Sequence, residues 1–349
     1  MRKFDYSFLK RISVPADIMN SATSIYEMKA KAELRRSDFA EVFSAMESVA
    51  KIQSVKSSNA IEGIITTDKR IRDIVNKSTA PQGHNELEIA GYRDALDLIH
   101  GSYSEIPFSE KSILELHRIL LQPSGDDLAG RYKTEDNFIM ETDREGVRSV
   151  RFTPVPASET AFAMEQLILA YHAAYSDAEI NPLMLIPCVI LDLLCIHPFR
   201  DGNGRMSRLL SLLLMYKSEF NAGKYVSIEE QINTYKNYYY TSLQKSSERW
   251  HENDNNYFPF IENFLFNLKM SYFELDSRFA SLKDRKITKK QRIEELVTGS
   301  LLPVSKREIC EKLPDISVTT VEAELARLLK SGRIEKIGNG RGTKYCCCH

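Results

Sequence analysis

The 349-residue chain lacks several features that would place it in a common functional class. Its formal net charge is only −1, so the whole molecule offers no strong field for nucleic acid or a membrane surface. The N-terminal segment MRKFDYSFLKRISV lacks the apolar core of a signal peptide. The apolar run of residues 183–196 is too short to span a bilayer. We therefore expect a cytoplasmic protein that makes no membrane contact.

Two familiar motif classes are also missing. No GxxxxGK[ST] loop occurs, which excludes a P-loop enzyme, and no pair of histidines has the spacing of a zinc site. Cysteine is rare, and Cys188 and Cys195 lie in apolar, helix-like surroundings where a thiol behaves as a small hydrophobe. Cys346 to Cys348 precede His349, and adjacent cysteines do not easily close a tetrahedral metal site. We expect a disordered tail there, with metal binding as the alternative.

Most of the chain has the apolar periodicity of helices. Apolar residues recur every three or four positions from 37 to 57, and similar patterns predict helices at 85–101, 109–121, 157–176, 182–196, 203–219, 228–245 and 257–283. One segment differs: a turn cluster from Thr142 to Gly146 precedes Val147 to Phe152, where apolar and basic residues alternate. This predicts a short β-hairpin, which should lie on the helices because isolated hairpins are marginal in water. A plain surface excursion is the alternative.

The last 60 or so residues differ in charge and pattern. Residues 286–345 contain 13 basic and 8 acidic residues, a net charge of +5. Three helical patterns followed by two strand-like pieces are the order of a winged helix-turn-helix, which suggests DNA binding through residues 317–330 and a wing at 333–344. However, Glu322 and Glu324 would repel phosphates on that helix. Protein docking or dimerisation is therefore the favoured role, and a homodimer remains open beside DNA contact.

The segment HPFRDGNGRMSR, residues 197–208, combines several groups that suit phosphate chemistry. Pro198 favours a helix end at or before His197, and Gly202 and Gly204 allow a ligand to approach the backbone closely. Exposed N–H groups at the start of the following helix form an anion site. The histidine can take a proton near neutral pH. The spacing therefore places a base beside an anion site in one loop.

The charged residues of the same segment strengthen that interpretation. Arg205 and Arg208 are three positions apart, so both guanidinium groups can lie on one helical face and grip phosphate oxygens. Asp201 offers a hard carboxylate oxygen suited to a Mg²⁺ ion bound to phosphates. Short GNGR segments alone are usually incidental turns, but the complete twelve-residue combination is far more specific.

The full segment resembles the signature of the Fic family, and residues 130–139 (GRYKTEDNFI) and 150–156 (VRFTPVP) resemble the family's target-binding flap. The resemblance implies a mainly α fold, a Fic-type helical bundle with a small β-hairpin flap, to which a C-terminal winged helix domain is added. The expected domains are an N-terminal helical region (1–104), a Fic core (105–245), a helical connector (246–285) and the winged helix domain (286–349).

The resemblance also implies a reaction, the transfer of AMP from ATP to a protein Ser, Thr or Tyr hydroxyl. His197 would be the general base and Asp201 would hold Mg²⁺ or Mn²⁺. The backbone around Gly202, Asn203 and Gly204 would cradle the α- and β-phosphates, and Arg205 and Arg208 would stabilise the β- and γ-phosphates. A target protein would dock on the flap near Val150 to Thr153, as an added strand.

An upstream segment matches the family's inhibitory pattern. Ser58, Asn59, Ala60, Ile61, Glu62 and Gly63 spell a Ser, three residues, Glu and Gly, although the same letters would also fit a helix that simply ends at Gly63. The resemblance implies an inhibitory helix near residues 45–63, whose Glu62 pairs with Arg208 and takes the place of the γ-phosphate. In some relatives the same glutamate also serves in AMP removal, and the sequence does not choose between the two directions.

Two further expectations are less specific. Residues 225–245 contain many tyrosines, and Tyr239 is the best single candidate for a wall of the adenine site, although a Tyr stripe at helical spacing is more often core. The alternatives to AMP transfer are a regulator that senses nucleotide and acts through the winged helix, and transfer of a different phosphate-containing group.

Overall fold

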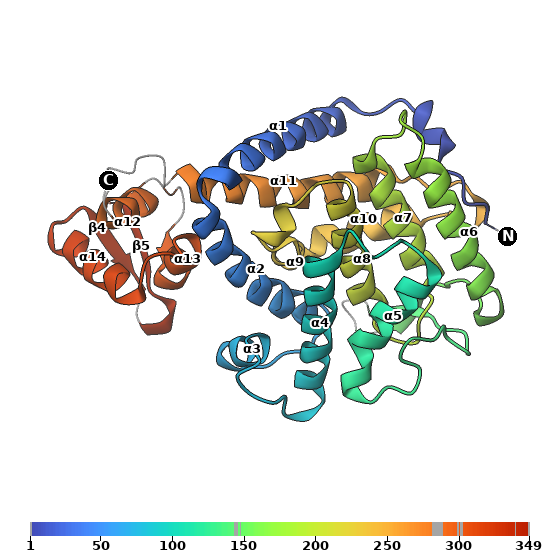
Figure 1. Ribbon diagram of the computed structural model, residues 1–349, viewed down its shortest axis with the longest axis horizontal. Coiled ribbons are helices and arrows are strands. Elements are labelled where there is room, and N and C mark those ends of the chain that lie inside the picture. Colours follow the sequence, from blue (N-terminus) through green and yellow to red (C-terminus); the bar gives the residue numbers. More distant parts are fainter. Residues whose placement is uncertain are drawn as a thin grey trace.

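The protein consists of a large helical lobe and a small C-terminal module (Figure 1). The computed structural model describes residues 2–142, 146, 148–280, 289–298, 300, 303–338 and 340–347. The helices of the larger lobe are α1 (Ala16–Asp38), α2 (Ala40–Ile61), α3 (Asp68–Val75), α4 (Gly83–Ser102), α5 (Glu110–Leu121), α6 (Ala157–Tyr175), α7 (Pro182–Ile196), α8 (Asn203–Lys217), α9 (Ile228–Thr234), α10 (Lys236–Ser247) and α11 (Phe258–Ala280). None of the described helices combines the length and apolarity that a bilayer span requires.

The mainly helical fold class is confirmed, and most predicted helices lie close to their expected bounds. One prediction is wrong: residues 228–245 form two helices, α9 and α10, rather than one. The break falls at Tyr235, whose φ of −107° and ψ of 36° lie outside the helical region. Apolar periodicity continues across the break, so the pattern did not reveal it.

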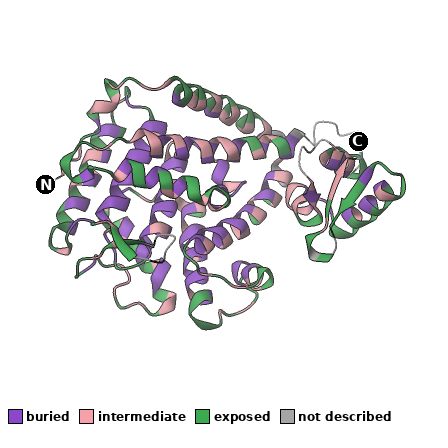
Figure 2. Cartoon of the chain, turned by 180° about the vertical axis from the view of Figure 1, so that it is seen from behind, coloured by how far each residue is buried: buried purple, intermediate pink, exposed green. Residues whose placement is uncertain are grey.

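Helix α7 is the centre of the larger lobe. It begins at Pro182, and the Asn181 side chain accepts a hydrogen bond from the Leu183 amide, which caps its N-terminus. All residues from Leu183 to Ile196 are buried, as Figure 2 shows for the purple helices at the core. A helix that is apolar on every side must be surrounded by other elements. Its C-terminus is therefore held rigidly at the point where the HPFRDGNGRMSR segment begins.

A buried carboxylate in α7 fixes the N-terminal segment to this core. Asp192 is fully buried and accepts hydrogen bonds from Tyr6 Oη at 2.8 Å, Trp250 Nε1 at 2.7 Å and Tyr257 Oη at 3.0 Å. Arg2 Nη2 lies 3.2 Å from the same carboxylate. Burial raises the pKa of Asp192, while the Arg2 charge and the hydrogen bonds oppose that rise. The Asp192 carboxylate is thus a buried charge whose two oxygens both have partners.

Asp192→Ala should lower the free energy of unfolding by about 3–5 kcal/mol, because it leaves Arg2 and three donors buried without their shared acceptor. Asp177→Ala is the matched control, since Asp177 pairs with Lys10 on the surface, and such pairs contribute about 1 kcal/mol or less. Urea unfolding followed by circular dichroism measures both. Equal losses in the two variants would contradict this account of the core.

The predicted β-hairpin is present. Strands β1 (Ile139–Thr142) and β2 (Arg148–Phe152) pair antiparallel, and the register shifts between Ile139 and Met140. Part of the predicted turn cluster, residues 143–145, lies outside the described residues. The end of β2 lies on the helical lobe, because Phe152 stacks on His251 and the His251 ring contacts the Thr153 carbonyl at 2.8 Å. The strands themselves are largely exposed.

The C-terminal module contains α12 (Lys289–Thr298), β3 (Val304–Ser305), α13 (Lys306–Lys312), α14 (Val318–Lys330), β4 (Ile334–Ile337) and β5 (Lys344–Cys347). Its three strands form an antiparallel sheet in the order β3–β5–β4. The expectation of a disordered cysteine tail is wrong for Cys346 and Cys347, which pair with Glu335 and Ile334 in this sheet. Strand pairing with β4 orders them, whereas Cys348 and His349 lie outside the described residues.

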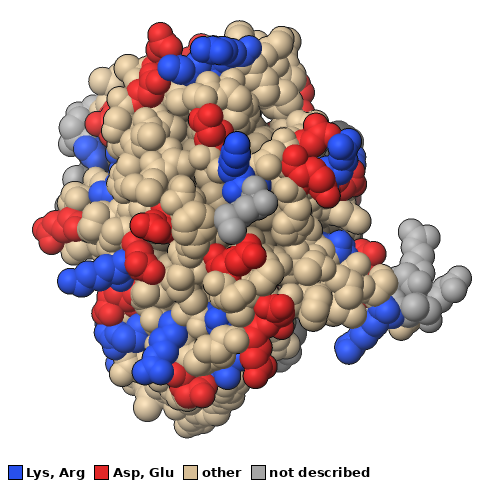
Figure 3. Space-filling model, turned by 90° about the vertical axis from the view of Figure 1, so that its right-hand side faces the viewer, with Lys and Arg blue, Asp and Glu red and all other residues tan. Residues whose placement is uncertain are grey.

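Helix α14 also corrects one argument about DNA. Glu324 is buried and pairs with Arg327 at 2.6 Å, so it does not face a docked phosphate. Glu322 remains half exposed and pairs with Lys306 at 2.6 Å. Basic and acidic side chains are also interspersed at the end of the larger lobe that lies away from this module, as Figure 3 shows. Of the two glutamates, only Glu322 is therefore exposed enough to repel a DNA phosphate at this helix.

Candidate active site

The HPFRDGNGRMSR segment forms a tight loop between α7 and α8. His197 ends α7 in the left-handed conformation, with a φ of 51°, and its amide still donates to the Leu193 carbonyl at 2.9 Å. A non-glycine residue adopts this conformation at a cost, which the surrounding structure must offset. The turn directs the chain away from α7 at the point where Pro198 prevents the helix from continuing.

Asn203 fastens the two ends of this loop together. Its side-chain oxygen accepts from the Phe199 amide at 3.0 Å, and its side-chain nitrogen donates to the Phe199 carbonyl at 2.8 Å. Gly202 has a φ of 80°, a conformation that favours glycine, immediately before α8 begins at Asn203. The N–H groups of the first turn of α8 have no acceptor within the helix, so they face the loop as an anion site.

The second arginine of the signature is held by the end of α2. Arg208 Nη2 donates to Glu62 Oε1 at 2.7 Å and to the Ser58 carbonyl at 2.9 Å, and Nε donates to Ser58 Oγ at 2.8 Å. The guanidinium is almost completely buried, whereas the Glu62 side chain is 32% exposed. Both residues of the inhibitory pattern, Ser58 and Glu62, therefore meet the same arginine, although 146 positions separate Glu62 from Arg208.

The carboxylate of Glu62 also occupies space at the start of α8. A Cβ atom at Gly204 would collide with it, so only glycine leaves room for this arrangement. Helix α2 ends at Ile61, and Gly63, with a φ of 81°, terminates it while the Ile64 amide donates to the Asn59 carbonyl. Lys236 of α10 donates to the Ile61 carbonyl at 2.6 Å. Glu62 is thus carried on a fixed helix end.

Arg205 is buried between two acidic residues. Its side chain is 1% exposed, with Nη1 2.6 Å from Glu88 Oε2 and Nη2 3.2 Å from Asp201 Oδ2. The sequence assigned Arg205 to the β- and γ-phosphates, and that role stays a prediction, while the guanidinium itself lies between two carboxylates. The buried Glu88 of α4 requires this cation as its partner. The i,i+3 spacing alone could not reveal Glu88.

A pocket opens between the loop, α2, α10 and the hairpin, and we call it the His197 pocket. It is lined by Glu62, Ile139, Arg151, Phe152, Leu194, Cys195, His197, Gly204, Arg208, Tyr239, Tyr240, Leu243 and Ser247. Its polar side contains Glu62, His197 and Arg208, and the rest is mostly apolar or aromatic. A phosphate-binding end beside an apolar end is suited to a nucleotide.

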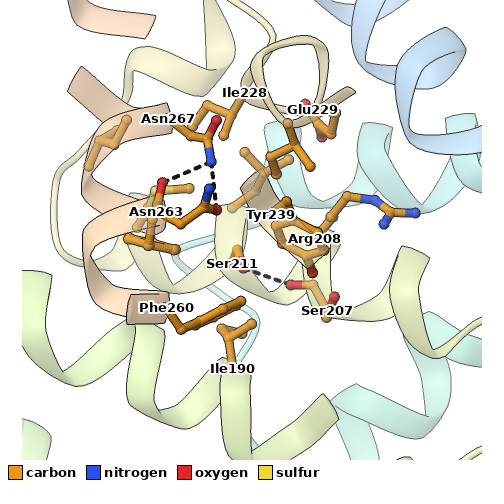
Figure 4. A pocket seen from close by; sticks show the side chains of 15 residues that line it. Ile190, Ser207, Arg208, Ser211, Ile228, Glu229, Tyr239, Phe260, Asn263 and Asn267 are labelled. Atoms are coloured by element: carbon orange, nitrogen blue, oxygen red, sulfur yellow. Dashed lines mark hydrogen bonds between the residues drawn. The ribbon is translucent and has the colours of Figure 1, made fainter. Parts of the chain in front are cut away.

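Tyr239 and its neighbour Tyr240 both line the His197 pocket. Tyr239 is 6% exposed and also borders a second, inner pocket on the other side, which Figure 4 shows beside Ser207 and Arg208. The more exposed Tyr240 contacts Tyr239 edge-on, with ring centroids 5.4 Å apart. The sequence predicted Tyr239 as a wall of the adenine site, whereas its neighbour Tyr240 is the less buried of the two tyrosines that line the pocket. Helical periodicity does not distinguish adjacent tyrosines in this way.

Two basic residues near the loop were not recognised in the sequence. Lys133 is buried and donates to Asn137 Oδ1 at 2.7 Å and to the Ile196 carbonyl at 3.3 Å, next to His197. Burial lowers its pKa to about 8. Arg151 lines the pocket from β2, where the register shift makes it the extra residue between Val150 and Phe152. Bulges of this kind redirect a side chain. No sequence pattern predicted the bulge at Arg151.

The surroundings of His197 favour the neutral form of its side chain. Burial lowers its pKa to about 4, and the nearby Lys133 charge acts in the same direction. The Leu194 carbonyl, Glu62 and Asp201 favour the protonated form, but they do not outweigh burial. At pH 7 the imidazole is therefore unprotonated, which is the form that a general base requires.

We expect the acid limb of the kcat/KM profile to fall near pH 4 rather than at the ordinary histidine value of about 6.5. The imidazole charges only as the pH falls through its lowered pKa, so the base is intact above that point. A pH series of the AMP transfer proposed below, with circular dichroism to confirm folding at each pH, measures the limb. An acid limb near 6.5 would contradict the assignment of burial as the dominant influence.

The loop also has a suitable donor for a divalent cation. The Asp201 side chain is 63% exposed, and Oδ2 accepts from Arg205. Within the described residues no cluster of three or more His, Cys, Asp or Glu side chains has the arrangement of a metal site. A single exposed carboxylate suits Mg²⁺, which usually completes its octahedral coordination with water and substrate phosphates. Asp201 therefore fits a cation that arrives with a nucleotide.

The region that contains this site is similar in sequence to known proteins. Residues 107–215 match the model of the Fic/DOC family. The chain is 30% identical over 179 residues to a protein adenylyltransferase Fic from Nematostella vectensis, and 30% identical over 194 residues to protein adenylyltransferase fic-1 from Caenorhabditis elegans. These matches cover 49% and 54% of this chain, but only 39% and 33% of the relatives' own lengths.

Solved structures extend the likeness of the fold. A Fic family protein from Desulfovibrio desulfuricans G20 has a TM-score of 0.62 at 18% identity, and the match covers 97% of both chains. A Fic-1 structure from C. elegans has a TM-score of 0.56 at 21% identity over 76% of this chain and 73% of that one. Residues 107–215 are thus similar in sequence to a Fic domain, and the solved structures show the same fold.

Proposed function

We propose that this protein is an adenylyltransferase that transfers AMP from ATP to a hydroxyl of a target protein or of itself. The observation that carries the proposal is the His197 pocket, where an unprotonated histidine and a buried arginine lie in one cavity with an apolar end. The relatives named protein adenylyltransferase support the same reaction class.

The proposed reaction is one in-line displacement. His197 accepts the proton of a Ser, Thr or Tyr hydroxyl, and that oxygen forms a bond to the α-phosphorus of ATP while the bond from the α-phosphorus to the bridging oxygen breaks. Pyrophosphate leaves with that electron pair, and AMP remains on the protein oxygen. Most of the rate enhancement then comes from orientation and from electrostatic stabilisation of the phosphates.

The phosphates have two sets of donors. The N–H groups at Gly202, Asn203 and Gly204 lie at the start of α8 and suit the α- and β-phosphates. The guanidinium of Arg208 suits the terminal phosphate, once Glu62 no longer occupies it. Asp201 would hold Mg²⁺ or Mn²⁺, which supplies charge neutralisation for the phosphates. Arg205, paired with Glu88 and Asp201, is better placed to orient Asp201 than to touch ATP.

The apolar end of the pocket suits the nucleoside. Leu194, Leu243 and the ring of Tyr240 can enclose a planar base, and Ser247 offers a hydroxyl at the same end. Arg151 adds a cation there, which can stack on a base or donate to its ring nitrogens. These residues come from α7, α10 and β2, so the hairpin contributes to both nucleotide and target binding.

The target protein would dock along β2. In the described part of the sheet β2 pairs only with β1, so its other edge is available for an extended segment. Val150 is 52% exposed and Met140 is 51% exposed, which gives this hairpin apolar surface beside the pocket. Main-chain pairing would position a target hydroxyl without selecting much of its sequence.

Glu62 would inhibit this reaction. A terminal phosphate and the Glu62 carboxylate require the same guanidinium, and the carboxylate holds it by a charge-assisted hydrogen bond in a largely buried position. ATP could then bind only in a pose that misplaces its α-phosphorus. The inhibited state therefore needs displacement of the α2 end before transfer.

Intact-protein mass spectrometry tests the proposed function. After incubation of the Glu62→Gly protein with ATP and Mg²⁺, we expect a mass increase of one AMP on a Ser, Thr or Tyr side chain. A phosphate adduct would assign transfer of a different group, and the absence of any adduct with self or lysate proteins would favour a nucleotide sensor. Both of these outcomes would reject AMP transfer.

A further inference from the structure

His117 of α5 lies between the HPFRDGNGRMSR loop and the segment that leads to the hairpin. It is 1% exposed, and its two ring nitrogens contact different parts of the chain. Nδ1 accepts from the Gly130 amide at 3.0 Å, and Nε2 lies 3.1 Å from the Asp201 carbonyl oxygen. Because an amide can only donate, Nδ1 is the unprotonated nitrogen. Nε2 therefore carries the hydrogen and donates to Asp201.

Packing fixes the orientation of this ring. The imidazole is stacked on Phe199, with ring centroids 3.7 Å apart and an angle of 10° between the planes. Gly202 lies against its edge, since a Cβ atom there would be 3.7 Å from His117 Nε2. Gly130 has a φ of 77°, and a Cβ atom there would be 2.9 Å from Arg118 Cβ. Both glycines have a positive φ, so the backbone on either side of the ring forms turns that favour glycine.

We propose that His117 is a positioning residue that joins the Asp201 carbonyl to the root of the hairpin segment at Gly130. Asp201 is held at its backbone by His117 and at its side chain by Arg205. Gly130 precedes the segment that runs through Lys133 and Asn137 to β1. One ring thereby sets the orientation of the carboxylate relative to the strand that would hold the target.

The alternative is that His117 only fills space in the core. Two substitutions separate the alternatives, because each keeps one end of the ring. In His117→Asn, the side-chain oxygen can take the place of Nδ1 and accept from Gly130, but nothing reaches Asp201. In His117→Gln, the side-chain nitrogen can take the place of Nε2 and donate to Asp201, but nothing accepts from Gly130. Loss of packing would affect both variants alike.

Amide hydrogen exchange tests the positions directly and does not depend on any activity. We expect His117→Asn to speed exchange at Phe199 and Met206, whose amides donate to Asn203 and Gly202 in the loop, while the Gly130 amide keeps its protection. We expect His117→Gln to speed exchange at Gly130 and to leave Phe199 and Met206 unchanged. Equal changes in both segments in both variants, or no change in either, would overturn the inference.

A second measurement adds the catalytic consequence, which rests on the function proposed above. In the Glu62→Gly protein, His117→Asn should raise the Mg²⁺ concentration for half-maximal AMP transfer roughly 10-fold, because groups that orient a metal-binding carboxylate typically contribute factors of this size. His117→Gln should leave it within about 2-fold. If the two variants shift it equally, the positioning role is rejected. If the Glu62→Gly parent itself transfers nothing, the proposed function fails, while the exchange experiment still decides the role of His117.

Discussion

The Glu62→Gly variant should transfer AMP about 10- to 100-fold faster than the natural chain. In the natural chain, Arg208 is occupied by Glu62 and Ser58, and the pair with Glu62 is a charge-assisted hydrogen bond. Such a bond to a charged group contributes about 1.5–3 kcal/mol, and each 1.4 kcal/mol corresponds to a factor of ten. Removing the carboxylate frees the guanidinium for the terminal phosphate and clears the space beside Gly204.

Glu62→Gln is the matched control for that variant. The amide has nearly the same volume and can still accept from Arg208, but its hydrogen bond is about half as strong as that of the carboxylate. We therefore expect a rate between those of the natural chain and the glycine variant. Labelling by α-labelled ATP in a time course measures all three proteins. A glycine variant that labels no faster than the natural chain would refute inhibition by Glu62.

His197→Ala, introduced into the Glu62→Gly protein, should lower the rate of AMP transfer by about 10²- to 10⁴-fold. The neutral imidazole is the only histidine that lines the His197 pocket in the described part of the chain. Alanine removes the proton acceptor and leaves Arg208 and the start of α8 in place. ATP binding should therefore persist, and equilibrium dialysis with labelled ATP measures it separately from the rate.

The control for this loss is His172→Ala in the same protein. His172 is an exposed residue of α6, and its Nε2 contacts the Phe108 carbonyl at 2.8 Å. It does not line the His197 pocket, so its loss should change the rate less than about 3-fold, which is under 1 kcal/mol. Comparable losses in the two variants would point to a general effect on folding and would remove His197 from the role of base.

The sequence was most informative where many constraints fall in consecutive residues. The loop from His197 to Arg208 could be predicted because its proline, glycines and charged residues each have a local conformational or chemical meaning. The pairing of Glu62 with Arg208 was predicted only through family resemblance, and the contact of Ser58 with the same arginine was not predicted, since those contacts join positions about 150 apart. Most helices were predicted by periodicity, but α1 and α3 were not, and the break at Tyr235 was missed because apolar spacing continues across it.

What the sequence could not reveal lies in contacts between distant elements. The sequence predicted Arg205 only as a phosphate ligand, because its partner Glu88 lies on α4, which only the fold brings beside it. His117 belongs to no recognisable sequence motif, yet its two nitrogens contact Gly130 and Asp201. Cys346 and Cys347 looked like a free tail because their strand partner is β4, which only the folded sheet identifies.

An ion pair connects the C-terminal module to the larger lobe. Arg307 of α13 pairs with Asp68 of α3 at 2.7 Å, and Lys56 of α2 also pairs with Asp68 at 2.6 Å. A pocket between the two parts is lined by residues of α2, α3, α9 and α13, including Lys56, Asp68, Glu230, Arg307 and Cys310. The module therefore contacts α3 at Asp68, and Asp68 in turn pairs with Lys56 of the helix that carries Glu62 to Arg208.

Transfer of label from ATP tests the central claim most directly. The Glu62→Gly protein is incubated with Mg²⁺ and with ATP labelled either at the α- or at the γ-phosphate, and the protein is then separated from nucleotide under denaturing conditions. The account predicts stable label from α-labelled ATP, none from γ-labelled ATP, and loss of the α-label in the Glu62→Gly/His197→Ala protein. Label from the γ-phosphate, or an α-label that persists without His197, would contradict it.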